Sequence, residues 1–300
     1  EYRVSPKFSF SAGVRYNETE YQTYKDRLAD RETTRFPLNV YYELTPKLDL
    51  ILGYTYSNSD IEGTSYSFDS TTQSIVPNVP TQPIGLTNFK ATLTETTTNV
   101  FQTGYERDSH FYNIGLRGNI STKLTGYFKV GYRTRSFGDS TRFSTKFITT
   151  NETINGVDSE PKDDKDEDDQ DIKRNDSGML GLDANLTWMA TTKLLVQLAL
   201  SSDYGAGGEG ESTEITRANL VGNYSFNTHW SAMANLGYTE TDYPDDGRDE
   251  EQLTGGLRFN YVLNTYWRFS AGYTYTDNDS SRANSSYDNN TLDLTAILRY

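Results

Sequence analysis

The chain has 300 residues, enough for two ordinary domains or one large all-β domain. Hydrophobic residues make up 34% of it and the formal net charge is −14, which argues against a packed soluble core. The chain also contains 23 Tyr, more aromatic residues than a disordered acidic chain carries, which argues against disorder. No run of about 18 apolar residues occurs, which excludes a transmembrane helix. The absence of Cys excludes disulfides and thiolate metal sites. The negative charge disfavours nucleic acid as a partner.

A turn-forming tripeptide recurs along the chain, each time directly before an apolar or aromatic residue. Pro, Asn, Ser and Thr favour tight turns because they preset φ or bond their own backbone. The tripeptides begin at residues 5, 45, 121, 191, 227 and 264, so the interval is 36–40 residues apart from two longer ones. This spacing indicates an internal repeat with two insertions. The six copies are Ser5-Pro6-Lys7, Thr45-Pro46-Lys47, Ser121-Thr122-Lys123, Thr191-Thr192-Lys193, Asn227-Thr228-His229 and Asn264-Thr265-Tyr266.

Between these turns the hydrophobic pattern has a period of two. Residues 48–56, 112–120, 180–188, 253–261 and 292–300 each place apolar side chains on one face and small or polar ones on the other. Such alternation over about ten residues predicts β-strands. Each repeat then holds two strands, and six repeats predict about 12 long antiparallel strands in a single domain, 1–300. Residues 59–106 and 139–175 are predicted to be long loop insertions.

The alternation alone does not say which face meets water, so a soluble all-β repeat protein is one interpretation. Strands of about 9–11 residues, short turns at one end and long loops at the other favour the alternative, a transmembrane antiparallel up-and-down β-barrel. Aromatic residues recur on the apolar face at two levels, as interfacial belts require. One belt is near the short turns and the other, which also includes Tyr16, nearer the long loops. The predicted belt residues are Trp188, Trp230, Trp267, Tyr54, Tyr132, Tyr238 and Tyr273.

These motifs resemble the putative β-barrel porin 2 family of bacterial outer-membrane barrels, which is found with exopolysaccharide biosynthesis and export systems. The resemblance is carried by Thr45-Pro46-Lys47-Leu48, by the Gly-Tyr dipeptides ending at Tyr54, Tyr132, Tyr238 and Tyr273, and by the C-terminal segment 286–300. It implies an outer-membrane location after removal of a signal peptide, contact with lipid and lipopolysaccharide, and a polysaccharide export partner. It also implies that Tyr300 is the terminal aromatic read by the barrel-assembly machinery.

If the apolar face meets lipid, the polar face lines the lumen, where eight cations face four carboxylates. Two readings stay open for these charges: they pair across strands and plug the barrel, or they form a basic wall that attracts anions or an acidic polymer. The function is accordingly an outer-membrane pore or export conduit for anionic or saccharide solutes, or alternatively a plugged barrel that displays acidic loops for adhesion or assembly. The predicted lumen residues are Arg15, Glu43, Asp49, Arg117, Lys129, Arg133, Arg135, Asp183, Arg258, Arg268, Asp293 and Arg299.

The acidic excess gathers in the insertions, with nine carboxylates between Asp158 and Asp171. A solvated loop or weak Ca²⁺ or Mg²⁺ binding would explain this run, and EF-hand spacing is absent. No other cofactor is expected. The glycine-rich segment 205–210 matches G-x-G-x-x-G but lacks the helix that a nucleotide site needs, so it is predicted to be a flexible hairpin loop. His110 and His229 fall at opposite ends of the barrel, and no enzyme activity is expected.

Overall fold

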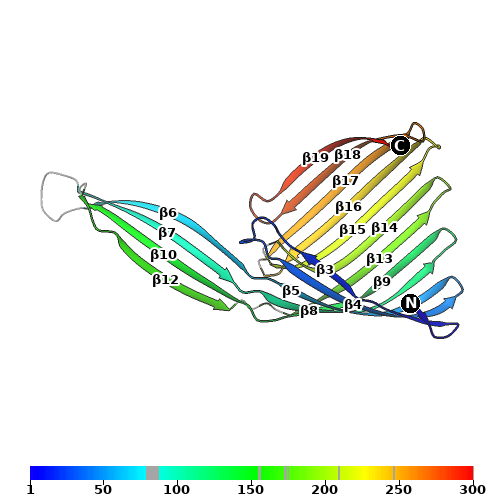
Figure 1. Ribbon diagram of the computed structural model, residues 1–300, viewed down its shortest axis with the longest axis horizontal. Coiled ribbons are helices and arrows are strands. Elements are labelled where there is room, and N and C mark those ends of the chain that lie inside the picture. Colours follow the sequence, from blue (N-terminus) through cyan, green and yellow to red (C-terminus); the bar gives the residue numbers. More distant parts are fainter. Residues whose placement is uncertain are drawn as a thin grey trace.

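The chain folds into two antiparallel β-sheets in the computed structural model, which describes residues 1–78, 88–154, 157–171, 174, 176–208, 210–245 and 247–299. No helix occurs among these residues, and so none that could cross a membrane. The larger sheet contains fourteen strands and the smaller one five. Figure 1 shows the larger sheet curled about a hollow side and the smaller one projecting from it.

In the larger sheet, neighbours in space are mostly neighbours in sequence. Both chain ends lie at the end of this sheet where the short turns are, here called the short-turn end, and the opposite end is the long-loop end (Figure 1). The strands, in sheet order with β3 beside β4, are β1 (Tyr2–Arg3), β2 (Phe8–Ala12), β3 (Arg15–Thr19), β4 (Arg31–Thr45), β5 (Leu48–Ile61), β8 (Tyr105–Asn119), β9 (Leu124–Phe137), β13 (Ser177–Met189), β14 (Leu194–Ala206), β15 (Ser212–Ser225), β16 (Trp230–Tyr243), β17 (Arg248–Val262), β18 (Trp267–Ser280) and β19 (Tyr287–Leu298).

The predicted all-β, antiparallel, up-and-down architecture is confirmed, but the predicted number of twelve strands is not. The chain begins with the two-residue strand β1, and β2 and β3 pair with successive parts of β4 on either side of a break at Gly13. The sheet is also not closed, because among the described residues β19 pairs only with β18. The two edges of the curled sheet therefore stand apart.

The recurring tripeptides form the short turns, and their first side chain explains their composition. The Asn227 and Asn264 side-chain oxygens accept hydrogen bonds from the backbone N–H groups of Trp230 and Trp267, each at 2.9 Å. The Thr191 hydroxyl accepts in the same way from the Leu194 N–H at 3.0 Å. Five of the six turns thus provide a side-chain acceptor for the first backbone donor of the strand that follows, and in the sixth the Thr45 hydroxyl accepts from the Lys47 N–H instead.

The two insertions, predicted to be loops, contain long strands where the structure describes them. The β6–β7 hairpin continues the β5–β8 pair, and β10 and β12 continue β9 and β13 in the same way. In the smaller sheet β10 pairs with β7, which joins the two hairpins into one projection (Figure 1). These strands are β6 (Thr64–Asn78), β7 (Asn88–Gln102), β10 (Thr141–Ile154), β11 (Val157–Asp158) and β12 (Lys162–Asp171).

The outer, convex face of the larger sheet is apolar and exposed, whereas its hollow, concave face is polar and partly buried. Leu236 and Leu294 leave 52% and 77% of their surface open on the convex side, and the aromatic ring of Phe111 on the concave side is 3% exposed. Small residues mark where the sheet bends: a Cβ added at Gly131 would lie 1.8 Å from the Tyr112 carbonyl oxygen. Close backbone approach of this kind requires glycine.

The prediction that the convex face meets lipid is tested by two adjacent substitutions in β15. Leu220 pairs with Leu198 and Leu236 on the convex face, whereas Asn219 pairs with Ala199 and Gly237. We expect Leu220→Arg to lower the free energy of unfolding in lipid vesicles by about 2–4 kcal/mol, because a charge facing hydrocarbon is costly. Asn219→Arg, which adds the same charge on the concave face, should have a much smaller effect. Equal losses in urea titrations followed by Trp fluorescence would contradict a lipid-facing convex surface.

Candidate lumen site

Side chains from distant strands meet across the concave face near the long-loop end. In sheet order β4 and β14 are separated by β5, β8, β9 and β13, yet Arg35 Nη1 of β4 lies 2.8 Å from Asp203 Oδ2 of β14. Arg133 of β9 reaches the other oxygen of the same carboxylate at 3.2 Å. One Asp203 carboxylate thus holds two guanidinium groups: Arg35 reaches it across the hollow, and Arg133 reaches it along the wall, with only β13 between their strands.

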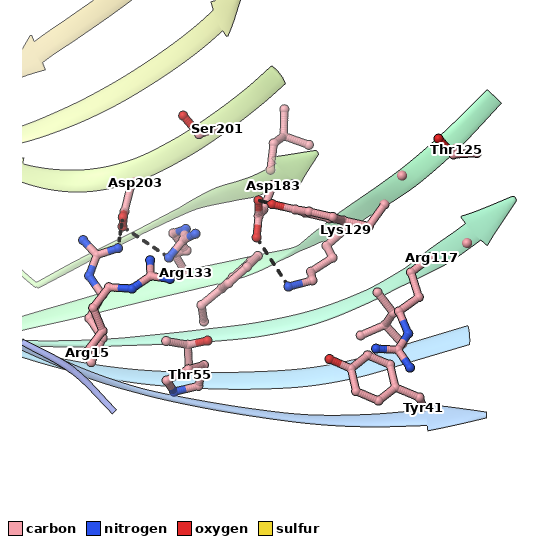
Figure 2. A pocket seen from close by; sticks show the side chains of 18 of the residues that line it. Arg15, Tyr41, Thr55, Arg117, Thr125, Lys129, Arg133, Asp183, Ser201 and Asp203 are labelled. Atoms are coloured by element: carbon pink, nitrogen blue, oxygen red, sulfur yellow. Dashed lines mark hydrogen bonds and ion pairs between the residues drawn. The ribbon is translucent and has the colours of Figure 1, made fainter. Parts of the chain in front are cut away.

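Below these pairs, towards the short-turn end, lies a cavity of about 760 Å³. Figure 2 shows Arg133, Lys129 and Arg117 pointing into it, each nearer the short-turn end than the one before. Asp183, on the neighbouring strand β13, lies beside Lys129. The charged residues that line the cavity are five cations and two carboxylates, in a chain whose net charge is −14. They are Arg15, Arg35, Arg117, Lys129, Arg133, Asp183 and Asp203.

Most of these cations have a carboxylate partner on another strand. Lys129 Nζ lies 3.4 Å from Asp183, and Arg117 Nε lies 2.9 Å from Asp49. Arg15 has no ion-pair partner among the described residues, although it lines the same cavity. The cavity is therefore basic in sum, with its charges largely tied to fixed positions.

Arg117 also closes the cavity towards the chain start. It donates hydrogen bonds to both carboxylate oxygens of Glu1, at 2.7 and 2.9 Å. These bonds hold the pKa of the Glu1 carboxyl down to about 2, because the guanidinium favours the charged form. Glu1 stays ionised at any pH at which the protein would function.

Aromatic rings lie against the arginines of the cavity wall. The guanidinium carbon of Arg117 sits 3.3 Å from the centre of the Tyr41 ring, and that of Arg133 sits 3.8 Å from the Phe111 ring. Stacking of this kind fixes a guanidinium while leaving its edge N–H groups free to donate. Because Tyr41 and Phe111 are buried beneath these guanidinium groups, it is the cations that face the cavity.

Above the shared carboxylate, a second set of contacts crosses the hollow. We call it the cross-lumen layer, and it consists of Arg31, Tyr105, Arg107, Arg135 and Glu214 with residues 205–208 and Gly210. Arg135 is almost fully buried and pairs with Glu214 at 2.9 Å. The Tyr105 hydroxyl donates to the Gly210 carbonyl at 2.7 Å, and Arg31 donates to the Ala206 carbonyl at 2.6 Å. The glycine-rich β14–β15 tip is thus docked across the hollow instead of being a free loop.

Glycine is required at the tip itself. Gly210 has φ +82°, in the left-handed region that side chains disfavour, and a Cβ there would lie 3.2 Å from the Ala29 Cβ. The Ala29 N–H donates to the Gly208 carbonyl at 2.9 Å, so backbone meets backbone across the layer. A bulkier residue would push the tip away from the opposite wall.

The remaining predicted lumen residues lie outside the cavity. Glu43 pairs with the exposed Arg3 at 2.9 Å, and Arg258 pairs with Asp293 at 3.0 Å on the β17–β19 side. Arg268 and Arg299 are exposed and have no ion-pair partner among the described residues. The basic site is thus concentrated on β3, β4, β8, β9 and β13–β15.

The sequence prediction missed Arg35, Arg107, Asp203 and Glu214. Arg107 lies five residues before the predicted strand 112–120 and continues its polar alternation, whereas Arg35 and Asp203 lie on β4 and β14, for which no strand bounds were predicted. Strands here are 13–15 residues long in most cases, longer than a minimal membrane crossing. Following the alternation to its end would have found Arg107.

The predicted belt residues occupy two levels of the convex face. Trp188, Trp230 and Trp267 are exposed at the short-turn end, where the last two begin β16 and β18. Tyr54 and Tyr132 both pair with Tyr112 at the level nearer the long-loop end. Tyr238 and Tyr273 lie on β16 and β18, and Tyr300 falls outside the described residues. Their role as lipid-interface belts stays a prediction.

The acidic run forms β12, whose ten residues are all exposed and pair with β10. Thr149 and Thr141 hydroxyls donate to Asp163 and Asp171 at 2.9 and 3.4 Å. Within the described part of the chain, no group of three or more His, Asp or Glu side chains is arranged to hold a metal ion. The weak Ca²⁺ or Mg²⁺ binding considered for this segment stays a prediction.

Comparison with solved structures returns outer-membrane channels and receptors at low identity. The CymD monoaromatic hydrocarbon channel matches with TM-score 0.42 and 11% identity over 99% of this chain and 80% of its own. The P. putida toluene transporter TodX matches with TM-score 0.36 and 10% identity, and the match covers 98% of this chain and 78% of TodX. The Yersinia pestis ferric yersiniabactin uptake receptor FyuA matches with TM-score 0.28 and 12% identity. The match covers 86% of this chain and 44% of FyuA, so the chain spans less than half of that receptor.

No curated protein matches the sequence. The family model described as putative β-barrel porin 2 matches residues 165–300, a range that runs from β12 to the end of the chain and contains two of the four Gly-Tyr dipeptides. The resemblance read from the turns and strands is thereby confirmed for this part: residues 165–300 carry the sequence pattern of the putative β-barrel porin 2 family of outer-membrane barrels.

Proposed function

We propose that the protein is a conduit of the bacterial outer membrane for anionic solutes, and that acidic saccharides are the class its wall fits best. The observation that carries the proposal is the basic cavity on the concave face of a strongly acidic chain. A cleft lined by one sign of charge raises the local concentration of the opposite ion. The family's occurrence with exopolysaccharide systems agrees with this class of solute.

The wall presents fixed cations at several levels, which suits a long anionic solute such as an acidic saccharide. Arg117 and Arg133 are stacked on the buried rings of Tyr41 and Phe111, which holds their guanidinium groups in the wall. A sugar carboxylate can accept hydrogen bonds from a cation that is not already paired. Arg15, which lacks a carboxylate partner among the described residues, is the cation best placed to bind a passing anion.

A conduit requires a wall on all sides, and β1–β3 and β19 stand apart at the two edges of the sheet. The proposal therefore includes coverage of these edges in the membrane. We also infer that the barrel-assembly machinery inserts the protein, with Tyr300 as part of the recognised strand, and that lipid and lipopolysaccharide surround the convex face. A polysaccharide export system is the partner that fits the proposed solute.

The alternative, a plugged barrel that displays acidic strands for adhesion or assembly, is favoured by the cross-lumen layer. Arg135, Tyr105 and the β14–β15 tip fill the hollow above the cavity. The exposed carboxylates of β12 would then form the working surface. The two functions differ in whether ions pass the layer.

Ion selectivity tests the basic wall. In planar bilayers under a salt gradient, we expect the protein to conduct anions in preference to cations. The double variant Arg15→Glu and Lys129→Glu should shift the zero-current potential towards cation selectivity, because it reverses two charges of the cavity lining. Lys25→Glu, at an exposed loop position, is the matched charge control and should have little effect. Cation selectivity of the unaltered protein would refute a basic passage.

Shortening the β14–β15 tip tests whether the layer restricts the passage. Ala206 and Ser212 pair directly, so replacing residues 207–211 by Asn-Gly gives a two-residue hairpin of favoured type. We expect conductance to rise, because the contacts of the tip with Ala29 and Tyr105 are lost. Replacing 279–286 by Asn-Gly, between the paired Asn278 and Tyr287, is the control at the same end of the sheet. Unchanged conductance in the first variant would show that the tip does not restrict ion flow.

A further inference from the structure

A second cavity lies beyond the cross-lumen layer, at the long-loop end. It measures about 1120 Å³ and lies between the root of the smaller sheet and the outer turns of the larger one. It shares none of its lining residues with the basic lumen cavity. The site is therefore separate from the proposed conduit.

One wall of this cavity is a row of hydrogen-bonding side chains in register across the smaller sheet. Thr64 of β6 pairs with Gln102 of β7, which pairs with Arg142 of β10, which pairs with Gln170 of β12. An Arg142 guanidinium nitrogen donates to the Gln102 side-chain oxygen at 3.2 Å. The row presents amides, a hydroxyl and a guanidinium at regular strand spacing, which suits the hydroxyl groups of a chain of sugars.

Arg174, on the opposite wall, is buried and incompletely paired. Its side chain is 4% exposed and stacks 3.7 Å over the Tyr105 ring. Its Nε lies 3.5 Å from Asp245, and neither Nε nor Nη1 has a hydrogen-bond acceptor among the described residues. Both nitrogens are enclosed by the protein, so Arg174 contributes a buried, incompletely compensated positive charge beside the cavity, and such a charge favours an anion there.

The remaining charges strengthen this preference. Arg248, 10% exposed, also lines the cavity, where it stacks 3.5 Å over the Tyr243 ring and forms ion pairs with Glu211 and Glu250 at 3.6 Å. Among the described residues, five arginines and three carboxylates line the cavity, again a positive sum in an acidic chain. The arginines are Arg27, Arg142, Arg174, Arg248 and Arg282, and the carboxylates are Asp171, Glu211 and Asp245.

Two aromatic rings complete the lining. Tyr66 and Phe68 lie on β6 with ring centres 6.5 Å apart, and Phe68 is exposed. Alternate residues of a strand share a face, so both rings stand beside the Thr64 end of the polar row. Exposed rings beside guanidinium groups bind the apolar face of a sugar while its carboxylate pairs with arginine.

We infer that this outer cavity is a binding site for an acidic saccharide, a chain of sugars bearing carboxylates, outside the conduit itself. Arg174 and Arg248 attract a carboxylate to the base by their charge, the row from Gln102 to Gln170 binds hydroxyl and carboxylate groups, and Tyr66 and Phe68 pack against sugar rings. This inference goes beyond conduction, since a saccharide can bind here whether or not ions pass the cross-lumen layer.

The test is isothermal titration of the detergent-solubilised protein with tetragalacturonate and with maltotetraose, its uncharged counterpart in length. We expect tetragalacturonate to bind at least about tenfold more tightly. Arg142→Gln should weaken that binding about tenfold or more, the size expected when a charge-assisted hydrogen bond is removed, and Arg174→Gln should weaken it because a buried positive charge beside the cavity is lost. Arg142 is exposed, so its variant is expected to fold even if the Arg174 variant does not. Arg268→Gln, an exposed arginine at the short-turn end, is the matched control and should bind normally.

Three results would overturn the inference. These are equal affinity for the charged and uncharged saccharides, inorganic phosphate binding as tightly as tetragalacturonate, and an equal loss in the Arg268 control. Because these titrations need no membrane current, their failure is distinguishable from failure of the proposed conduit. Repeating the titration in the Arg15→Glu, Lys129→Glu background separates the outer cavity from the lumen, because the loss of affinity caused by Arg142→Gln should persist there.

Discussion

Backbone hydrogen bonding is the constraint on which the rest of this structure depends. In an apolar medium each backbone N–H and C=O must find a partner within the protein, so long paired strands are one of the few ways for a chain to cross it. Pairing forces side chains to alternate, and the apolar set here gathers on the convex face. The polar set is left on the concave face, where Arg117, Lys129 and Arg133 become the lining of a cavity. The turns that begin with Asn227 and Asn264 satisfy the donors at the strand ends.

Once arginines are gathered on the inside of a curled sheet, their desolvation governs the arrangement there. Arg133 and Arg35 converge on the single carboxylate of Asp203, although they come from strands that are far apart in the sheet. A buried guanidinium without partners is strongly unfavourable, so such contacts draw the opposite walls together. The β14–β15 tip adds carbonyl oxygens where side-chain carboxylates are lacking. Fixed cations with some unused N–H groups are the physical basis for both proposed anion sites.

The sequence allowed the repeat, the turns and the outward and inward faces to be predicted, because strands with one apolar face alternate visibly. It did not predict the smaller sheet, since β7 and β10 are rich in Thr and polar on both faces and show no such alternation. Nor could it predict that Gly210 approaches Ala29, because a contact between distant walls leaves no local pattern. Arg107 was missed for a simpler reason: its strand was begun at residue 112, whereas β8 begins at Tyr105.

The most direct test of the central claim, that the concave face is aqueous and the convex face meets lipid, is a cysteine scan along β16. The chain has no Cys, so each single variant from Ser231 to Thr239 carries one thiol. In lipid vesicles, we expect a membrane-impermeant maleimide to label Met233, Asn235 and Thr239 variants, and a lipid-borne quencher to reach probes at the even-numbered positions. Labelling with the opposite alternation, or with none, would contradict the account.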